Sequence, residues 1–553
     1  MLKALLLLAS GLLLAAGTAL AAPSPAADVQ PDPLTVKTDR GVVHGAAGPG
    51  VREFKGIPFA LPPVGERRFA PPEPAAPWAG VLDATQYRSA CPQPSRYGLT
   101  DASDDENCLY LNVTAPAPAP APAAKDSPAK KRPVIVWIHG GAYVGGSSNL
   151  YPLDYLSRTG DLVVVSINYR LGVLGFMAHP ALPAAHGGSL GLEDQREALR
   201  WVKRNIGAFG GDPANVTLAG ESAGAASVCM QLIAAEQSRG LFQKAIVQSL
   251  ACDVPLESAA GARRTGEQVA KLLHCDDAAA AAACLRSKSI HEILDVQGSV
   301  ASANPRAFTP SLGSISVPRQ GAEAFSSGRF LRVPMINGGN RDEMRLYVAY
   351  AIGAGQAITS ETYPKLLASI YGDVGPEVAA EYPPEKFPAV PSALGTVESD
   401  FMPGGALSNC LYLKSGADAS RYVPVYEYEF ADRHAPPEMA DPGFEMGAVH
   451  AAELPYFFPH ISHNSKIDGP DLEPSSQGLS EAMVAYWSSF AHTGSPAPAG
   501  LPAWPKYRAA SDVMRFEPGE VHTFDASAEH HCGFWQGHYP DSLSPNARPI
   551  ARR

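Results

Sequence analysis

The feature that most constrains the fold is the run from Gly220 to Gly224, Gly-Glu-Ser-Ala-Gly, which fits the pattern G-x-S-x-G. Residues 215–219 ahead of it are short and apolar enough for a buried strand, and residues 225–233 behind it suit a helix. A strand that turns sharply into a helix holds the middle residue, Ser222, in a strained conformation, and glycines flank it because a side chain there would clash across the turn. The hydroxyl then lies at a helix N-terminus, where partial positive charge favours a developing anion. A Gly/Ser-rich turn with no catalytic role also fits this pentapeptide. The rest of the sequence is needed to distinguish this interpretation from a catalytic serine.

The segments around this turn predict a mostly parallel sheet with helices on both faces. Continuous apolar runs are typical of strands that are covered on both sides. The strand candidates are residues 107–113, which alternate like a strand, together with residues 133–138, 161–168, 244–248 and 333–338. Residues 192–209 have helical periodicity. Strands that alternate with helices along the chain indicate an α/β fold. Nearer the N-terminus we expect a hairpin at residues 40–45 and a mostly irregular, Pro/Gly-punctuated segment at residues 54–65.

The N-terminus predicts a secretory signal peptide at residues 1–21. Lys3 supplies the positive charge, the following residues are almost wholly apolar, and Ala19-Leu20-Ala21 offers an A-x-A cleavage site. The apolar run is short and leads into an Ala/Pro-rich flexible leader at residues 22–33, so we expect no stable membrane anchor. The protein is thus expected to be secreted or periplasmic.

The remainder, residues 34–545, is predicted to be a single catalytic domain. Residues 115–131 are rich in Ala, Pro and Lys and carry no apolar anchor. Such a composition favours an exposed, semi-rigid loop between two strands and not a domain boundary.

Composition and cysteine spacing argue against several classes of partner. The formal net charge is -11 and no basic patch is visible, so we expect no nucleic-acid partner. The eight cysteines suit an oxidising compartment, and the absence of C-x-x-C spacing argues against a structural zinc site. His530-His531-Cys532 superficially resembles a ligand cluster. Adjacent residues of an extended chain point in opposite directions, so we expect no metal there.

Several further runs occur in the order that one enzyme family has them. They are residues 54–65, 105–113, 137–143, 168–176, 191–195, 209–213, 220–227, 486–496 and 504–507. With these runs the chain resembles the type-B carboxylesterases, the cholinesterase-like branch of the α/β-hydrolase superfamily, over roughly residues 34–540. The resemblance implies an α/β-hydrolase fold with helical excursions covering the active site. It also implies a secreted serine carboxylesterase that acts on small-molecule esters without a cofactor.

The resemblance supplies partners for Ser222. A nucleophilic serine needs a base, and the base needs an orienting carboxylate, in the chain order Ser, acid, His. The family's histidine motif is matched around His450, and its acid motif is matched by residues 338–343 with Glu343 in the acid position. Asp342 is the competing candidate, which composition alone does not separate from Glu343.

The resemblance also implies an oxyanion hole formed by the backbone N–H groups of Gly141, Ala142 and Ala223. Many members of the family carry Gly at the position of Ala142. Alanine keeps the N–H donor, so the departure is mild, although its methyl group narrows the pocket.

Three disulfides follow from the resemblance: Cys91–Cys108, Cys275–Cys284 and Cys410–Cys532. Cys229 and Cys252 remain, and we expect them to be free thiols. Cys229 follows the turn on its helix, which favours a small core residue over a reactive one.

Departures from the cholinesterases bear on the substrate. Their first disulfide loop carries a Trp that binds the choline cation, whereas residues 91–108 contain no Trp, and Tyr97 is their only aromatic residue. We therefore expect esters of neutral alcohols to be preferred. Two alternatives are a catalytically inactive, cholinesterase-like binding or adhesion protein and an esterase specialised for bulky natural or synthetic esters. The first is disfavoured because Ser222, Glu343 and His450 are all present.

Overall fold

A long twisted sheet organises the protein, which was studied as a computed structural model that describes residues 32–94, 101–118, 131–436, 439–462 and 469–543. In these residues the sheet has eleven strands in the order β14-β13-β12-β11-β10-β9-β7-β8-β6-β4-β3. Neighbours from β8 to β13 are parallel, and the strands at both edges are antiparallel. The bounds are β3 (Ala46–Gly48), β4 (Val51–Pro58), β6 (Tyr110–Pro116), β7 (Arg132–Ile138), β8 (Val163–Ile167), β9 (Gly211–Glu221), β10 (Lys244–Gln248), β11 (Met335–Asn340), β12 (Val425–Phe430), β13 (Val513–Glu517) and β14 (Glu520–Phe524). The prediction of a mostly parallel α/β sheet is confirmed.

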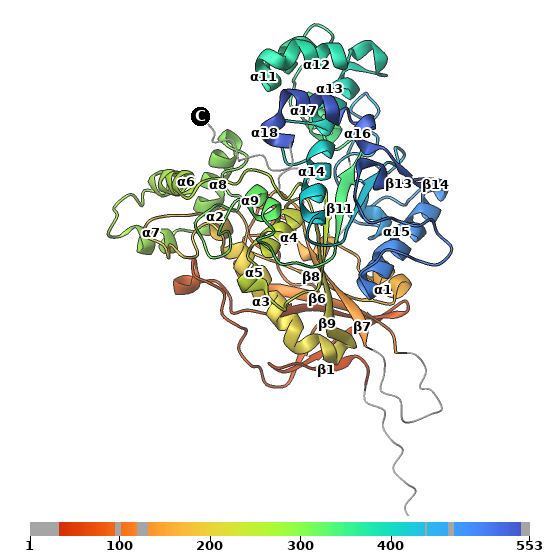
Figure 1. The fold of residues 1–553 in the computed structure, drawn as a ribbon. Coiled ribbons are helices and arrows are strands. Elements are labelled where there is room, and N and C mark those ends of the chain that lie inside the picture. Colours follow the sequence, from red (N-terminus) through yellow and green to blue (C-terminus); the bar gives the residue numbers. More distant parts are fainter. Residues whose placement is uncertain (1–31, 95–100, 119–130, 437–438, 463–468, 544–553) are drawn as a thin grey trace, which may run out of the picture.

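Helices cover both faces of this sheet (Figure 1). On one side lie α2 (Gly172–Phe176), α3 (Leu190–Asn205), α4 (Ala223–Ile233), α5 (Ala235–Ser238), α6 (Ala259–Leu272), α7 (Ala281–Ser287), α8 (Ile290–Ala303) and α9 (Gly321–Ser326), and on the other lie α1 (Asp154–Gly160) and α15 (Pro474–Thr493). Alternate residues of β7 divide between the two interiors: Val134, Val136 and Ile138 pack in one hydrophobic cluster, Ile135 and Trp137 in the other. From Val134 to Ile138 the strand is therefore apolar at every position, as a sheet buried on both faces requires.

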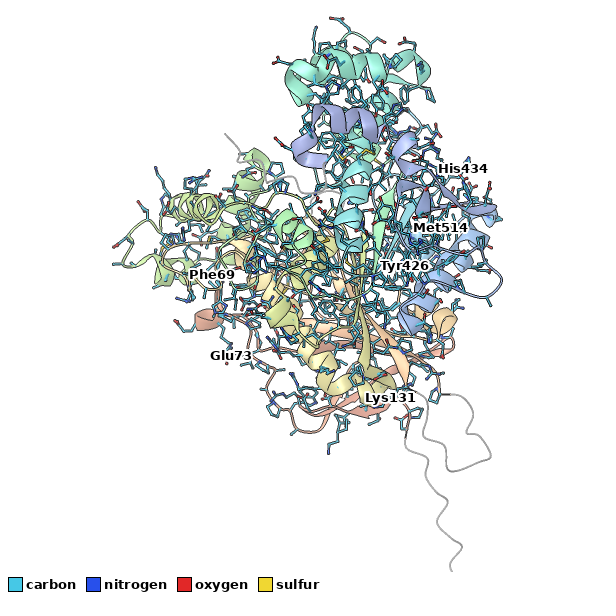
Figure 2. The ribbon with its side chains drawn as sticks, in the orientation of Figure 1. Phe69, Glu73, Lys131, Tyr426, His434 and Met514 are labelled. Atoms are coloured by element: carbon cyan, nitrogen blue, oxygen red, sulfur yellow. A yellow bond between two sulfur atoms is a disulfide. The ribbon has the colours of Figure 1, made fainter. Side chains whose placement is uncertain are left out.

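The C-terminal strands continue this packing. Side chains fill the space between the sheet and its helices (Figure 2). Tyr426 of β12 and Met514 of β13 are buried in the cluster on the α15 side.

A third hydrophobic cluster lies in a helical layer beyond the sheet (Figure 1). Its helices are α10 (Arg345–Gly353), α11 (Tyr363–Tyr371), α12 (Gly375–Glu381), α13 (Val390–Asp400), α14 (Asn409–Ser420), α17 (Cys532–His538) and α18 (Pro540–Leu543), with α16 (Ala526–Glu529) beside them. The Cys410–Cys532 disulfide joins α14 to α17. This layer combines the segment after β11 with the C-terminal segment of the chain.

The N-terminal part differs from the sequence prediction in two segments. A hairpin is present near the predicted residues 40–45, but it spans residues 35–44: β1 (Thr35–Lys37) pairs antiparallel with β2 (Val42–His44), and β5 (Val81–Asp83) completes a small sheet. Residues 54–58, predicted to be irregular, belong to β4 and pair with β6. The prediction failed because Gly56 has a φ of 68° at the irregularity between Phe54 and Ile57, so the strand tolerates a bulge that the Pro/Gly pattern presents as a break.

All eight cysteines form disulfides. Three pairs are those that the resemblance implies, Cys91–Cys108, Cys275–Cys284 and Cys410–Cys532. The expectation of free thiols is wrong, because Cys229 and Cys252 are bonded to each other with their Cα atoms 5.3 Å apart. Helix α4 connects β9 to the neighbouring strand β10, and the chain after β10 returns to the side of α4, so two positions that are distant in sequence meet.

Within the ranges given above, no helix combines the length and the apolar character needed to cross a membrane. The predicted signal peptide and nearly all of the leader lie outside the described residues, as do residues 119–130 of the predicted exposed loop.

Candidate active site

Ser222 lies on a strained turn between β9 and α4. Its φ is 56° and its ψ is -123°, an unfavourable conformation for a residue with a side chain. A Cβ on Gly220 would lie 2.6 Å from the backbone of Gly224, and one on Gly224 would lie 2.0 Å from the carbonyl oxygen of Ile138. Both glycines are therefore required by close backbone approach, as predicted. The Ser222 N–H donates to the carbonyl of Gln248 at 3.0 Å, which ties the turn to β10.

His450 connects Ser222 to Glu343. Its Nε2 lies 2.9 Å from the Ser222 Oγ, and its Nδ1 lies 2.8 Å from the Glu343 Oε2. Ser222 follows β9, Glu343 follows β11, and His450 lies after β12. The fold therefore brings the three residues together just beyond the carboxyl ends of parallel strands, the usual place for a site in such a sheet.

Glu343 and its neighbour Asp342 face different partners. The second carboxylate oxygen of Glu343 accepts hydrogen bonds from the Asn340 N–H and the Tyr412 hydroxyl, both at 2.9 Å. Asp342 instead forms ion pairs with Arg345 and Arg433, both at 3.2 Å. Of the two candidates left open by the sequence, Glu343 is the one that contacts His450.

Two further carboxylates near His450 were missed by the sequence analysis. The Glu221 Oε1 lies 3.2 Å from the His450 Nε2. Glu453 is buried close by and accepts hydrogen bonds from Gln248 at 3.1 Å and from Asn340 at 2.7 Å. Their positions offered a signal, because Glu221 directly precedes the serine and Glu453 follows the histidine by about one helical turn.

These carboxylates control the charge of His450, which is only 7% exposed. Burial by itself lowers the pKa of an imidazole, because it disfavours the charged form. The negative charges of Glu221 and Glu343, with a smaller contribution from Glu453, outweigh burial and raise the pKa of His450 to about 9. Burial raises the pKa of the Glu453 carboxyl.

The glycine turn after β7 presents backbone to the same site. Gly141, Ala142 and Tyr143 have consecutive positive φ angles of 106°, 53° and 63°. The Gly141 carbonyl accepts the N–H groups of Val144 and Gly145, both at 3.0 Å, which closes the turn. Successive residues in this conformation turn their N–H groups toward one side, as anion-binding loops do.

His139 stabilises this turn from the inside. Its ring stacks on Tyr169 with centroids 4.4 Å apart, and its Nδ1 lies 2.8 Å from the Gly140 carbonyl oxygen. Burial lowers the pKa of His139 to about 4, so the ring is neutral and its Nδ1–H donates to that carbonyl. His139 is thus a packing residue of the turn.

Ser222 and His450 open into a cavity of about 400 Å³. Its walls are largely apolar and aromatic, and its lining includes Gly141, Ala142, Leu150, Tyr151, Leu346, Tyr347, Tyr350, Met439, Met446, Val449, Leu454 and Ile461. Among the lining residues that the structure describes, Glu221 is the only Asp, Glu, Lys or Arg. Tyr97, the only aromatic residue of the first disulfide loop, lies outside the described residues.

In the described part of the chain, one group of side chains has the spacing of a metal site: Glu517, Glu520 and His522. It lies on the β13–β14 hairpin, and none of its members lines the cavity. In the other cluster that the sequence singled out, Cys532 is in a disulfide and His530 contacts two carboxylates.

Comparison with known proteins identifies the family. The sequence model described as the carboxylesterase family matches residues 32–535. The chain belongs to the carboxylesterase family. This carboxylesterase is 35% identical to the para-nitrobenzyl esterase of Bacillus subtilis (strain 168) over 493 residues, which cover 85% of this chain and 92% of that protein. It is 34% identical to the cocaine esterase of Homo sapiens over 536 residues, with 92% and 90% of the two chains covered.

Solved structures agree with the sequence comparison. A thermophylic PNB esterase is similar with a TM-score of 0.74 and 31% sequence identity, over 91% of this chain and 100% of that one. The resemblance found in the sequence is confirmed. This carboxylesterase is a carboxylic-ester hydrolase with an α/β-hydrolase fold, and its substrates are small-molecule esters.

Proposed function

We propose that this carboxylesterase hydrolyses its esters through a Ser222–His450–Glu343 triad and an acyl-enzyme intermediate. The observation that carries the proposal is the continuous pair of hydrogen bonds from Ser222 through His450 to Glu343, at 2.9 Å and 2.8 Å. A nucleophile, a base and an orienting carboxylate in this relation define acyl-transfer sites on unrelated folds. An inactive binding protein has no need to maintain such a chain behind a strained serine.

In the proposed reaction the Ser222 Oγ attacks the ester carbonyl while the His450 Nε2 takes its proton. Glu343 accepts the Nδ1–H of His450, which selects the tautomer with a bare Nε2 and stabilises the imidazolium once it forms. His450 then protonates the leaving alcohol. In the second half of the reaction it activates a water molecule, which releases the acid from Ser222.

The tetrahedral oxyanion is proposed to accept hydrogen bonds from the backbone N–H groups of Gly141, Ala142 and Ala223. Gly141 and Ala142 support this role because both line the cavity that contains Ser222 and both have positive φ angles, as anion-binding loops often do. Ala223 is the first residue of α4, so its N–H lies at the positive end of the helix.

The cavity supports a class of substrate. Its apolar walls favour uncharged acyl and alcohol groups, and its described lining offers no Lys or Arg for an anionic one. A volume of about 400 Å³ is within the usual range for small-molecule sites and suits short-to-medium acyl chains better than the bulky natural or synthetic esters considered above. We therefore propose neutral esters as substrates.

We also propose that residues 1–21 are a cleaved signal peptide, residues 22–33 a leader and residues 34–545 one catalytic domain that is exported. The disulfides support export, because such bonds persist in oxidising compartments.

Replacement of the nucleophile tests the proposed function. Ser222→Ala is expected to lower kcat for a 4-nitrophenyl ester on the order of 10⁵- to 10⁶-fold while the circular dichroism spectrum stays that of the parent. The matched control is Ser227→Ala on the same helix, whose hydroxyl contacts Gln195 at 2.9 Å, and it should retain activity. An organophosphate should label the parent on Ser222, as mapped by mass spectrometry. Near-full activity of pure Ser222→Ala would reject the triad.

A further inference from the structure

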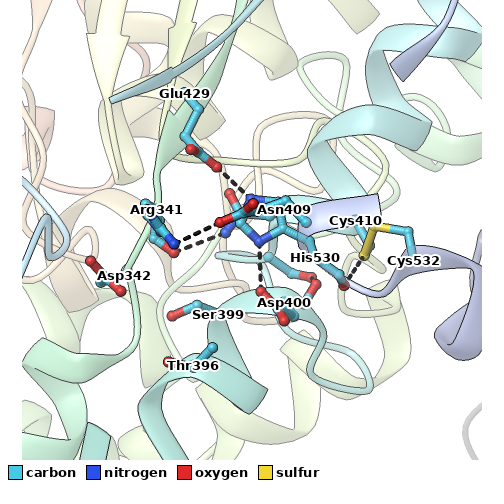
Figure 3. A network of polar contacts seen from close by, with 12 residues as sticks. Arg341, Asp342, Thr396, Ser399, Asp400, Asn409, Cys410, Glu429, His530 and Cys532 are labelled. Atoms are coloured by element: carbon cyan, nitrogen blue, oxygen red, sulfur yellow. Dashed lines mark hydrogen bonds and ion pairs between the residues drawn. A yellow bond between two sulfur atoms is a disulfide. The ribbon is translucent and has the colours of Figure 1, made fainter. Parts of the chain in front are cut away.

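A buried histidine outside the cavity, His530, lies in a network of charges (Figure 3). It is 3% exposed, its Nδ1 lies 2.6 Å from the Asp400 Oδ1, and its Nε2 contacts the Glu429 Oε2. A carboxylate can only accept, so both ring nitrogens must donate, and the ring is an imidazolium. Consistent with this, the carboxylates outweigh burial and raise the pKa of His530 to about 10.

The network spans several elements of the fold. Asp400 ends α13, Glu429 belongs to β12, and Arg515 of β13 donates to Glu429 at 2.8 Å. Arg341 follows β11 and forms an ion pair with Glu529 of α16 at 2.6 Å. The charged and titratable groups around His530 are thus Asp400, Glu429, Arg341, Arg515, Glu529 and Tyr382, whose hydroxyl donates to Asp400 at 2.8 Å.

The same network holds the backbone on both sides of Glu343. Two residues before it, the Arg341 carbonyl accepts a hydrogen bond from Asn409 at 3.1 Å (Figure 3). One residue after it, the Met344 N–H donates to the Ser399 Oγ at 2.9 Å. Ser399 directly precedes Asp400, so the position of α13 sets the position of this second anchor.

The disulfide completes the attachment. Cys410 directly follows Asn409, and Cys532 lies two residues after His530. Asn409 and His530 therefore belong to segments that are covalently joined close to the network, and Figure 3 shows this bond beside the histidine.

We propose that His530 is a positioning residue, whose imidazolium joins α13 to β12 and thereby holds the two backbone segments that flank Glu343 at the distance needed for the Glu343–His450 hydrogen bond. The inference rests on the proposed triad. Without the positive ring, the buried carboxylates of Asp400 and Glu429 repel each other. Helix α13 and its Ser399 anchor then move away from β12, and Glu343 moves with them.

The consequence reaches His450 through Glu343. A longer hydrogen bond orients the imidazole less well, and misplacement by about 1 Å costs on the order of 100-fold in rate. A weaker contact with the Glu343 carboxylate also lowers the pKa of His450. Both effects are absent if His530 contributes to folding alone.

The test is His530→Gln, which keeps a polar side chain but removes the positive charge between the two carboxylates. In the full-length enzyme kcat should fall by up to about 100-fold, the effect of a catalytic group misplaced by about 1 Å, while KM changes less than about threefold. The acid limb of the profile of kcat/KM against pH should move to lower pH. The matched control is His531→Asn, which replaces the adjacent, more exposed histidine with a residue that tolerates its φ of 50°. This control should have the same kcat as the parent and the same acid limb of kcat/KM against pH.

A second variant tests the proposal even if His530→Gln does not fold. Glu529→Gln weakens the Arg341 anchor at a partly exposed site and should fold normally. It should lower kcat by at most about fivefold, the rate equivalent of losing one partly exposed ion pair, and move the acid limb of kcat/KM to lower pH. The inference is overturned if a folded His530→Gln has the parent's kcat and the parent's acid limb of kcat/KM against pH. If His530→Gln does not fold, the same result for Glu529→Gln overturns it. Activity of Ser222→Ala would overturn the proposed triad instead, so the two failures are distinguishable.

Discussion

Replacement of Glu343 by Gln tests the carboxylate that is proposed to orient His450. The Glu343 Oε1 accepts from the Asn340 N–H and the Tyr412 hydroxyl, and the amide oxygen of Gln can keep both bonds. The amide NH₂ then faces the His450 Nδ1, which must become an acceptor. The proton moves to Nε2, the atom that has to receive the proton of Ser222. The protein should fold, but its histidine is in the wrong tautomer.

The size of the effect follows from this change of tautomer. The corresponding Asp→Asn change in serine proteases lowers kcat about 10⁴-fold, equivalent to about 5 kcal/mol of transition-state stabilisation. We expect Glu343→Gln to lower kcat by a similar factor, with little loss of stability because its hydrogen bonds to Asn340 and Tyr412 persist. Steady-state hydrolysis of 4-nitrophenyl butyrate and unfolding in urea measure the two quantities.

Asp342→Asn is the matched control, one residue away and equally buried. It breaks ion pairs with Arg345 and Arg433, of which Arg345 is also buried. Loss of a buried pair costs about 3 to 5 kcal/mol of stability, but the partners of Asp342 do not contact His450. The control should therefore lose stability and keep kcat within about tenfold. If Asp342→Asn loses the rate and Glu343→Gln retains it, the assignment of the acid is wrong.

The other predictions concern pH, the fourth disulfide and the substrate. Because carboxylates raise the pKa of His450 to about 9 and a general base must be neutral, kcat/KM should rise with pH through about 9. Glu221→Gln should move this rise in kcat/KM to lower pH by about one unit or more. An unchanged pH profile would contradict the electrostatic explanation. The Cys229–Cys252 bond closes a separation of 23 residues, so the double variant Cys229→Ala/Cys252→Ala should have an unfolding free energy about 3 kcal/mol lower and an unchanged kcat. Detection of two free thiols per chain in the denatured, unreduced parent would refute the bond. An uncharged thioester should be cleaved roughly thirtyfold or more faster in kcat/KM than butyrylthiocholine of matched size, because the loop from residue 91 to residue 108 has no Trp; a preference for the cation would show that this loop was misinterpreted.

Much of the fold and part of the candidate site could be predicted from the sequence, because the signals are local. Apolar runs predict strands that are buried on both faces, and the glycines around Ser222 are required by contacts within a single turn. Residues 54–58 were mispredicted because a glycine with positive φ permits a bulged strand where its sequence suggests a break.

Tertiary packing determined the rest of the candidate site. Glu343 and Asp342 are chemically alike and adjacent. Only the packing of the loop after β11 places Glu343 against His450 and Asp342 against two arginines. The bond between Cys229 and Cys252 depends on the return of the chain to α4 after β10.

His530 illustrates the same division. From the sequence it belongs to three consecutive residues that only superficially resemble a ligand cluster, and the fold surrounds it with Asp400 and Glu429 from two distant segments. Sequence spacing determines which residues can share a turn or a face of an element. The charge and the partner of a buried side chain depend on what other segments bring to it, and that is decided when the sheet and its helices pack together.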